Sequence, residues 1–385
     1  MYKKKHLNKY AKKSIKNWSR ETRLKIIITG GAGFIGTALV EYLLTHTEHQ
    51  LLVVDKLTYA ANLTQLDQFK RHYKTNHRFQ FIKADICDAS QVQTIFASFQ
   101  PNAIMHLAAE SHVDRSLTGP AEFIQTNIIG SYTLLEASRQ YWQQLSPAQQ
   151  QQFRFLQVST DEVFGDLADD KQNTGNALFT ETNAYAPSSP YSASKASADH
   201  LVQAWHRSYG LPTLISYCSN NYGPNQHKEK LIPKAIAQLA QGLAVPIYGN
   251  GLQIRDWLYV DDHVAALYLI LKQGKTGQSY AVGGKNQHTN LSLVQHIADL
   301  LDNYAEQGLC HKLQQPRRNL IEFVTDRPGH DQCYGIDNTK ISQQLHWLPQ
   351  YTLQQGLEKT IKHSFNKYNL YSVGSGEVIC QNSNC

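Results

Sequence analysis

Three adjacent residues in this chain have side chains suited to acid–base chemistry. Thr160, Asp161 and Glu162 come directly after the apolar stretch FRFLQVS. Two neighbouring carboxyls repel each other, and this repulsion helps to keep one of them protonated while the other is ionised. The two can also titrate as one unit. The pair is therefore a candidate acid and base, and an acidic turn or a helix cap is the alternative.

Tyr191 and Lys195 form a second candidate group. They lie four residues apart in SPYSASKASADHL, a segment with helical periodicity, so both side chains are expected on one helical face. A lysine ammonium beside a phenol favours the phenolate and lowers the pKa of the phenol from about 10. Tyr-x-x-x-Lys alone occurs by chance. Together with Thr160 and a glycine-rich turn upstream, it becomes specific.

The glycine-rich turn is TGGAGFIG, which follows the first apolar run and opens a helical segment. Gly31, Gly33 and Gly36 fit G-x-G-x-x-G, and Gly30 with the last two fits G-x-x-G-x-x-G. Glycine allows a tight turn and close approach to a pyrophosphate at the helix N-terminus. Asp55 ends the next strand about 20 residues later, as expected for an acid that binds a ribose diol. Because a carboxylate repels a 2′-phosphate, NAD is expected rather than NADP.

The elements that must position these residues alternate between strand and helix. Residues 34–46 have helical periodicity, and β-rich apolar runs occur at 24–30, 50–55, 79–86, 103–109, 153–160 and 212–219. Such alternation predicts an α/β fold, a Rossmann-type doubly wound parallel sheet covered on both faces. After Ser219 the pattern loosens into turn-rich segments, which indicates a smaller C-terminal substrate-binding region.

Composition limits the class of protein. The chain has 385 residues, 41% hydrophobic and 18% charged, so it can bury a large core. No stretch approaches the roughly 20 apolar residues of a membrane-spanning helix, and no apolar run follows the basic start. A cytoplasmic protein is therefore expected. The six cysteines form no C-x-x-C pair, so we expect free thiols and no metal site.

The net charge of +6 is concentrated at one end of the chain. Residues 1–25 hold ten Lys/Arg and one Glu, a net of +9, so the remaining 360 residues carry a net of −3. Such an arm can bind nucleic acid or an anionic membrane surface, although a disordered extension over 1–24 is the simpler interpretation. Residues 366–385 are expected to be an unstructured tail.

With these motifs in place, the chain resembles the extended short-chain dehydrogenases/reductases, and within them the 4,6-dehydratases of dTDP-glucose. The matching stretches include TGGAGFIG, DKLTYAAN, HLAAESHVDRS, VSTDEVFGDL, PSSPYSASKASADHL, SNNYGP, EKLIP, RDWLYVDDH and DRPGHD. They run from about residue 25 to 365. Many relatives share the glycines and Tyr-x-x-x-Lys, whereas Asp-Glu after the threonine marks a dehydratase.

The resemblance implies a reaction in which the cofactor is reduced and reoxidised within one turnover. Tyr191, steadied by Lys195, would take the proton of the glucose C4 hydroxyl while a hydride passes from C4 to NAD. Glu162 would remove the C5 proton, and Asp161 would protonate the departing C6 hydroxyl. Thr160 would hydrogen-bond the C4 oxygen. The hydride would return to C6, which gives a 4-keto-6-deoxy sugar for deoxysugar biosynthesis such as that of rhamnose.

The resemblance also implies a domain division and two binding sets. Residues 25–219, with part of 254–275, would bind NAD, and 220–365 would mainly bind the nucleotide sugar. The cofactor set comprises Gly30, Gly31, Gly33, Phe34, Ile35, Gly36, Asp55, Lys56, Leu57, Thr58, Asp85, Ile86, Leu107, Ala108, Ala109, Ser111, Thr126, Tyr191, Lys195 and Asn221. The substrate set comprises Ser111, Thr160, Asn220, Lys230, Leu231, Pro246, Tyr248, Arg255, Asn290, Asp326, Arg327 and His330.

Partners follow from the same resemblance. A homodimer is expected, formed by helices near 120–142 and 190–209, while nucleic acid is not expected despite the basic arm. For Arg255 and Arg327 a salt bridge at the surface or between domains is the alternative to substrate binding. Departures from the family pattern include His227 and Lys228, where an aromatic residue and a proline are usual, and Gln332 and Cys333, where basic residues are common.

Two other functions are compatible with parts of the sequence. A nucleotide-sugar epimerase or decarboxylase would use the same fold, but neither reaction needs an acid for a leaving group at C6. A catalytically silent NAD-binding regulator would use the basic arm to bind a partner. Intact Thr160, Tyr191 and Lys195 disfavour that third reading.

Overall fold

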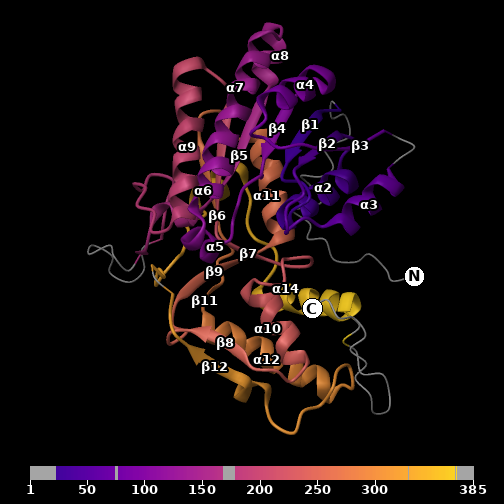
Figure 1. The fold of residues 1–385 in the computed structure, drawn as a ribbon, viewed down its shortest axis with the longest axis vertical. Coiled ribbons are helices and arrows are strands. Elements are labelled where there is room, and N and C mark those ends of the chain that lie inside the picture. Colours follow the sequence, from indigo (N-terminus) through magenta and orange to yellow (C-terminus); the bar gives the residue numbers. More distant parts are fainter. Residues whose placement is uncertain (1–22, 74–76, 168–177, 328, 369, 371–385) are drawn as a thin grey trace.

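A computed structural model describes residues 23–73, 77–167, 178–327, 329–368 and 370. The part drawn at the top of Figure 1 contains a seven-stranded parallel sheet in the order β10-β6-β5-β4-β1-β2-β3. Its strands are β1 (Lys25–Thr29), β2 (Gln50–Asp55), β3 (Phe79–Lys83), β4 (Ala103–His106), β5 (Arg154–Thr160), β6 (Thr213–Cys218) and β10 (Ser279–Val282). This is the doubly wound order 3-2-1-4-5-6 with one strand added, so the predicted fold class is confirmed.

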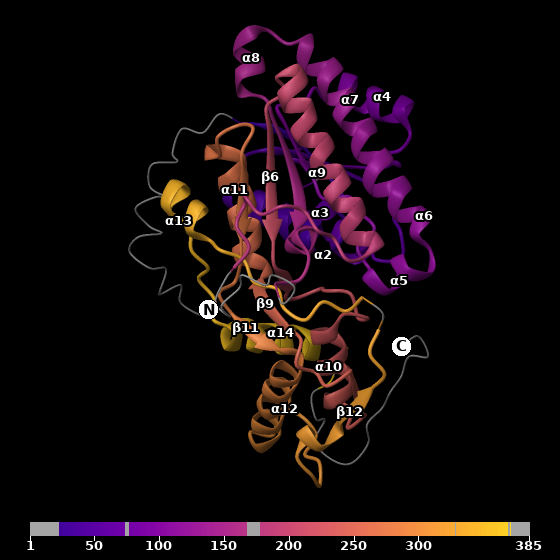
Figure 2. The ribbon, with the colours of Figure 1, turned by 90° about the vertical axis from the view of Figure 1, so that its left-hand side faces the viewer.

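Helices cover both faces of this sheet because its strands are apolar on both sides. Ile26 and Ile28 of β1 pack under α2 (Phe34–His46), α3 (Leu63–His72) and α11 (Val260–Gln273). Ile27, between them, faces α4 (Ala89–Phe99), α7 (Gly130–Gln143) and α9 (Pro190–Tyr209). Figure 2 shows α7 and α9 running side by side along the second face. The continuous apolar runs in the sequence thus reflect double-sided burial.

Helix α9 has clear start and stop signals. The Ser189 hydroxyl accepts from the Ser192 backbone N–H in a capping box, Pro190 occupies the first turn, and Gly210 ends the helix with φ +76°. A π-helical turn, η2 (Ile124–Ile129), joins α6 (Pro120–Phe123) to α7. Residues 120–143 therefore form one helical run, close to the predicted bounds.

The second part of the molecule has its own core. Two small sheets combine β8 (Val245–Tyr248) with β12 (Ile321–Val324), and β9 (Ile254–Tyr259) with β7 (Asn220–Tyr222) and β11 (Gln287–Thr289). Apolar side chains of α10 (Leu231–Ala240), α12 (Asn290–Glu306) and α14 (Leu353–Tyr368) pack against these strands. The remaining elements are α5 (Val113–Thr118), α8 (Pro147–Gln152), η3 (Asp161–Phe164), η5 (Arg317–Leu320) and α13 (Thr339–Leu345).

The chain returns to the large sheet through part of 254–275, as expected, and through one further strand. Within 254–275, α11 packs on the large sheet, but β9 pairs with β7 and β11 instead. Strand β10, at 279–282, lies beyond that range and completes the sheet beside β6. The prediction missed β10 because its four residues precede a glycine-rich turn and lack a readable period.

The predicted ends are only partly described. Helix α14 continues to Tyr368, so the predicted tail from 366 begins inside a helix. Residues 1–22 of the predicted extension and 371–385 of the tail lie outside the described residues. Within the described ranges, no helix is long and apolar enough to cross a bilayer, and no cluster of three or more potential metal ligands occurs.

Candidate active site

A cavity of about 670 Å³ lies between the carboxyl ends of the parallel strands and the second part of the chain. The carboxyl ends of the parallel strands lie at the same edge of the sheet, since Thr29 of β1 pairs with His106 of β4 and Thr160 of β5 pairs with Cys218 of β6. Ligands of open α/β sheets bind at this edge. The volume falls in the range of small-molecule sites.

The glycine turn forms one wall of the cavity. Gly30 has φ +72°, and a Cβ there would lie 2.5 Å from the backbone nitrogen of Ala108. A Cβ on Gly36 would lie 2.2 Å from the carbonyl oxygen of Gly30. Gly33 precedes α2 with no side-chain cap, so the first N–H groups of α2 remain available to an anion. Gly31 instead packs against Val53 and does not line the cavity.

Asp55 supports this wall with both carboxylate oxygens. They accept from the backbone N–H groups of Ala32 (3.0 Å) and Leu57 (2.8 Å). Burial raises the pKa of Asp55, and these two hydrogen bonds oppose the rise. The neighbouring Lys56 donates to the Thr126 hydroxyl at 3.0 Å. Asp55, Lys56 and Thr126 line the cavity, whereas Leu57 does not.

Thr160, Asp161 and Glu162 form a tight turn at the end of β5. The Thr160 hydroxyl accepts from the Glu162 backbone N–H and donates to an Asp161 carboxyl oxygen, both at 3.3 Å. Thr160 thereby caps the 3₁₀ turn η3, which starts at Asp161. The helix cap that was the alternative interpretation is therefore present, and the same three residues also line the cavity.

The two carboxyls have different electrostatic surroundings. Asp161 is 1% exposed, and burial raises its pKa well above 3.8, with Glu162 and Asp256 adding to the rise. Burial also raises the pKa of Glu162, but three cations oppose that rise, namely Lys230, Arg255 and Arg327. Asp161 is therefore suited to donate a proton and Glu162 to accept one.

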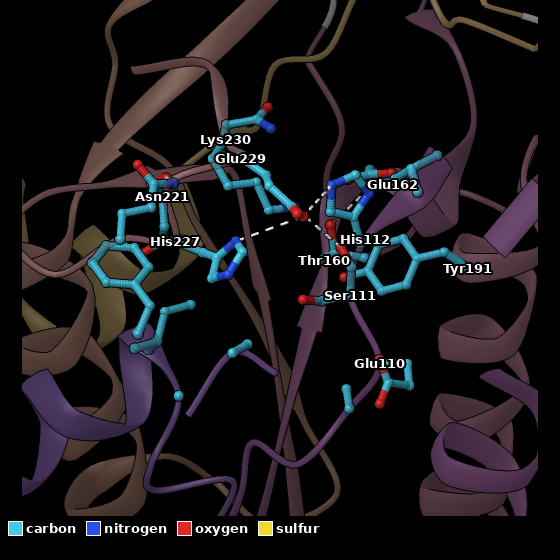
Figure 3. A pocket seen from close by; sticks show the side chains of 18 of the residues that line it. Glu110, Ser111, His112, Thr160, Glu162, Tyr191, Asn221, His227, Glu229 and Lys230 are labelled. Atoms are coloured by element: carbon cyan, nitrogen blue, oxygen red, sulfur yellow. Dashed lines mark hydrogen bonds and ion pairs between the residues drawn. The ribbon is translucent and has the colours of Figure 1, made fainter. Parts of the chain in front are cut away.

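Tyr191 and Lys195 lie on the first turns of α9, and both line the cavity. Burial raises the pKa of Tyr191 well above 10, and Glu162 is the next largest cause. The predicted lowering is wrong for this structure, because burial and the nearby carboxyls raise the pKa of Tyr191 and, among the described residues, only a hydrogen bond with Thr160 opposes the rise. The Lys195 ammonium donates to the carbonyl oxygen of Val158 at 2.7 Å. Figure 3 shows Tyr191, Thr160 and Glu162 around one end of the cavity.

Arg255 is the most constrained cation on the opposite wall. Its guanidinium donates to the carbonyl oxygens of Ile254 and Asp331, both at 2.8 Å, and stacks 4.3 Å from the Tyr334 ring centroid. These carbonyl contacts fix the orientation of the Arg255 guanidinium without neutralising its charge. Among the described residues no carboxylate lies within ion-pair distance of this guanidinium. An immobilised guanidinium of this kind can pair with phosphate oxygens.

Asp326 supports the wall from behind and does not line the cavity. Its carboxylate accepts from His330 Nδ1 at 2.6 Å and from Gln253 at 3.0 Å, which fixes the His330 ring. Arg327 reaches across to Asp114 at 3.5 Å, so the alternative of an ion pair between the two parts holds for Arg327. Both His330 and Arg327 still line the cavity.

A cluster that we call the Glu229 clasp joins the two parts across the cavity. Arg115 Nη2 lies 3.0 Å from both Glu229 oxygens, and His112 Nε2 and His227 Nδ1 approach the same carboxylate at 3.4 and 3.7 Å. The Arg115 guanidinium also lies 3.7 Å from the Tyr59 ring centroid. Figure 3 shows the Glu229 carboxylate between the two imidazoles. The sequence analysis singled out His227 but not its partners.

The structure brings the other predicted residues to the same cavity. Apart from Gly31, Leu57 and Asp326, every predicted cofactor and substrate residue lines it. Further lining residues that the sequence analysis did not assign include Ala60, Ala61, Glu110, His112, Ser159, Gln226, His227, Glu229, Trp257 and Tyr334. Several of these lie in quoted motifs, which was the available signal, but their residue types alone indicate no ligand.

Comparisons with known proteins agree with this geometry. A family model described as GDP-mannose 4,6 dehydratase matches residues 27–360. A dTDP-glucose 4,6-dehydratase of Shigella flexneri is 54% identical over 342 residues, covering 88% of this chain and 92% of that protein. Crystal structures of dTDP-glucose 4,6-dehydratases from Bacillus anthracis and Streptomyces venezuelae, both with NAD, are 36% and 35% identical, with TM-scores of 0.75 and 0.76. Each covers 89% of this chain and 97% of its own.

Proposed function

This chain belongs to the dTDP-glucose 4,6-dehydratase family, and we propose that it converts dTDP-glucose to the 4-keto-6-deoxy sugar in deoxysugar biosynthesis, using bound NAD. The observation that carries the proposal is that the Asp161 and Glu162 carboxyls have different electrostatic surroundings. One carboxyl is buried with its pKa well raised, and the other faces three cations. Elimination of water needs such an acid and base on one sugar.

NAD fits the first wall of the cavity. Side chains larger than hydrogen at Gly30 and Gly36 would collide with backbone atoms, and the uncapped start of α2 offers N–H groups to a pyrophosphate. Asp55 stands at the end of β2, where a carboxylate can bind a ribose diol. NAD, when bound, supplies a hydride acceptor for C4 and later a hydride donor for C6.

The side chains of this chain carry out the proton transfers. Tyr191 takes the proton of the C4 hydroxyl once its phenol has ionised to the phenolate, and Thr160 hydrogen-bonds the C4 oxygen. Once C4 is a ketone, the C5 proton is acidic and Glu162 removes it. Asp161 gives its proton to the C6 hydroxyl, which leaves as water. C6 then gains a hydride and C5 a proton, so no net oxidation occurs.

The substrate wall supports a nucleotide sugar. Arg255 is held rigidly by carbonyl oxygens and is suited to a phosphate, and Lys230 and Arg327 add positive charge next to Glu162. An epimerase would need no acid at C6, so the buried, protonated Asp161 favours the dehydratase over that alternative. The intact acid–base set disfavours a silent regulator.

Incubation of the purified chain with dTDP-glucose labelled with deuterium at C4 tests the proposal. We expect a keto sugar whose C6 methyl group carries the label, with no lasting accumulation of NADH. Steady accumulation of NADH would indicate a plain dehydrogenase, and a C4 epimer as the product would indicate an epimerase. The absence of any product would refute the proposal.

We also infer that two copies pair through η2, α7 and α9. Apolar side chains on these helices are unusually exposed, including Ile124 (51%), Ile129 (41%), Tyr132 (46%) and Tyr209 (47%). A second copy would bury this surface. Sedimentation should therefore give a dimer, and Ile124→Lys should give a monomer. The cytoplasmic location stays a prediction.

A further inference from the structure

Asp199 is a buried acid that the proposed reaction does not use. It lies four residues after Lys195 on α9, has 0% exposure, and does not line the cavity. Acidic side chains are rarely buried without a partner. The Ser159 hydroxyl donates to Asp199 Oδ2 at 2.5 Å, while Oδ1 has no hydrogen-bond partner in the described part of the chain.

The position of Asp199 connects the two groups of candidate catalytic residues. Ser159 directly precedes Thr160 at the end of β5, and Asp199 and Lys195 share one face of α9. The hydrogen bond between Ser159 and Asp199 therefore ties the strand of the acid–base pair to the helix of Tyr191. Ser159 and Lys195 both line the cavity, so a change at Asp199 can reach it through these two neighbours.

Asp199 and Lys195 stabilise each other's charged forms. Burial lowers the pKa of Lys195, and Asp199 is the largest opposing influence. Burial raises the pKa of Asp199 to about 7, and Lys195 is the largest opposing influence there. A buried ammonium without an anion nearby readily loses its proton. The carboxylate of Asp199 is therefore the natural counter-charge of Lys195.

The other titratable groups around the pair are neutral near pH 7. From β6, Cys218 has its pKa raised to about 12 and Tyr217 has its pKa raised, in both cases mainly by burial. From β4, burial and Lys195 lower the pKa of His106 to about 3. Burial likewise raises the pKa of Tyr185, from the loop before α9.

The carboxyls of η3 act on Tyr191 rather than directly on this pair. Glu162 and Asp161 both raise the pKa of Tyr191, whereas the charges that act on Lys195 are Asp199 and Cys218. Since Cys218 is neutral near pH 7, Asp199 is the group that supplies negative charge to Lys195.

We propose that Asp199 is a positioning residue whose carboxylate keeps Lys195 protonated, and that this ammonium, one helical turn from Tyr191, favours the phenolate form that takes the C4 hydroxyl proton. The role of Tyr191 in this inference rests on the proposed function. The link between Asp199, Lys195 and the ionisation of Tyr191 does not, because it can be measured without turnover.

Asp199→Asn tests the inference because it removes the charge and keeps the shape. We expect Lys195 to lose its proton at lower pH and Tyr191 to ionise about one pH unit or more higher, which corresponds to about a tenfold change in the ionisation equilibrium. The value of kcat at pH 8 should fall about tenfold. KM for dTDP-glucose should stay within about twofold, since Asp199 does not line the cavity.

The ionisation of Tyr191 is read from tyrosinate absorbance, as the difference between each variant and the same variant with Tyr191→Phe. Asp262→Asn is the matched control. Asp262 is also a buried acid, 4% exposed, with its pKa raised to about 6, and it accepts from the N–H groups of Gln350 and Tyr351 outside the cavity. This control should leave the pH profile of kcat and the Tyr191 titration unchanged.

A purely structural role makes a different forecast. In that case Asp199→Asn would lower kcat by one factor at every pH, and the Tyr191 titration would not move, which would overturn the proposal. If Asp199→Asn does not fold, Ser159→Ala and Asp199→Glu replace it. Ser159→Ala should shift the Tyr191 titration to higher pH by less than the shift expected for Asp199→Asn, and Asp199→Glu, which keeps the charge, should titrate like the unmodified chain. An unchanged Tyr191 titration in Ser159→Ala would overturn the proposal. Failure of the unmodified chain to make a keto sugar would refute the proposed function and leave this titration valid.

Discussion

Replacing Glu229 by glutamine should speed the loss of bound NAD about fivefold. The clasp joins residues 227–230 to residues 111–115, and both segments line the cavity together with the predicted cofactor residues. Glutamine keeps the shape of the side chain but removes the charge that attracts Arg115. We therefore expect the two walls to separate more often, which opens a path for the cofactor.

The magnitude follows from exposure and geometry. Arg115 and Glu229 are 44% and 40% exposed, so solvent screens their attraction, and such pairs contribute about 0.2–1 kcal/mol. Contact of one guanidinium nitrogen with both oxygens, plus two imidazoles near the same carboxylate, supports the upper end, about 1 kcal/mol. At about 1.4 kcal/mol per tenfold, this corresponds to a factor of about five.

The assay loads the chain with NAD, removes free NAD by gel filtration, and follows the release. Asp299→Asn is the control, since Arg318 and Asp299 form a bidentate pair of similar exposure, 50% and 46%, outside the cavity. Salt should speed release from the unmodified chain and have little effect on Glu229→Gln. Equal release rates for the unmodified chain and Glu229→Gln would refute the reasoning.

The clasp should also respond to pH. Burial lowers the pKa values of His112 and His227, so both rings are neutral near pH 7. Protonation at lower pH adds positive charge beside Glu229, so retention by the unmodified chain should improve as pH falls through these lowered values. Glu229→Gln should lack this improvement.

Four further changes test the site. Glu162→Gln should leave C4 oxidation possible but stop C5 deprotonation, so absorbance of reduced cofactor appears without product; normal turnover would contradict the assigned base. Asp161→Asn should slow product formation about 10²- to 10⁴-fold. Because the pKa of Asp161 is raised in the folded state, this carboxyl stabilises the fold below about pH 4, and the stabilisation is lost as pH rises. Urea unfolding should therefore show that Asp161→Asn gains stability relative to the unmodified chain from pH 5 to pH 8. A constant difference in the free energy of unfolding would contradict this. Arg255→Lys should raise KM for dTDP-glucose more than it lowers kcat, because lysine cannot reproduce the fixed fork; an unchanged KM would argue against phosphate binding. Gly36→Ala should yield protein without bound NAD, because its Cβ would overlap the Gly30 carbonyl; normal NAD content would contradict this.

Local sequence signals determine the first βαβ unit almost completely. The β-branched run before Gly30 and the helical period of 34–46 predicted β1 and α2 closely, since both patterns reflect burial on defined faces. The convergence of Thr160 and Tyr191 also followed, because the end of β5 and the start of α9 must meet at the carboxyl edge of a parallel sheet.

Features that depend on contacts distant in sequence could not be predicted. The orientation of the Lys195 ammonium toward Val158, the pairing of Asp199 with Ser159 and the contacts of Glu229 with Arg115 and His112 all join segments 37 to 117 residues apart. Periodicity reports which face of an element is buried, but not which distant atom it meets. The short strand β10 was missed for the same reason, since only pairing with β6 reveals it.

Three cations oppose the rise in the pKa of Glu162 that burial causes, and all three come from the later portion of the chain. Glu162 itself follows strand β5 in the earlier portion. A ribosome therefore completes the strand that leads to Glu162 long before it supplies the three cations that favour its ionised form. Until residues 230, 255 and 327 have docked, the Glu162 carboxyl lacks the three cations that oppose the rise of its pKa on burial. The nascent dehydratase is in this way chemically idle until its two portions have assembled.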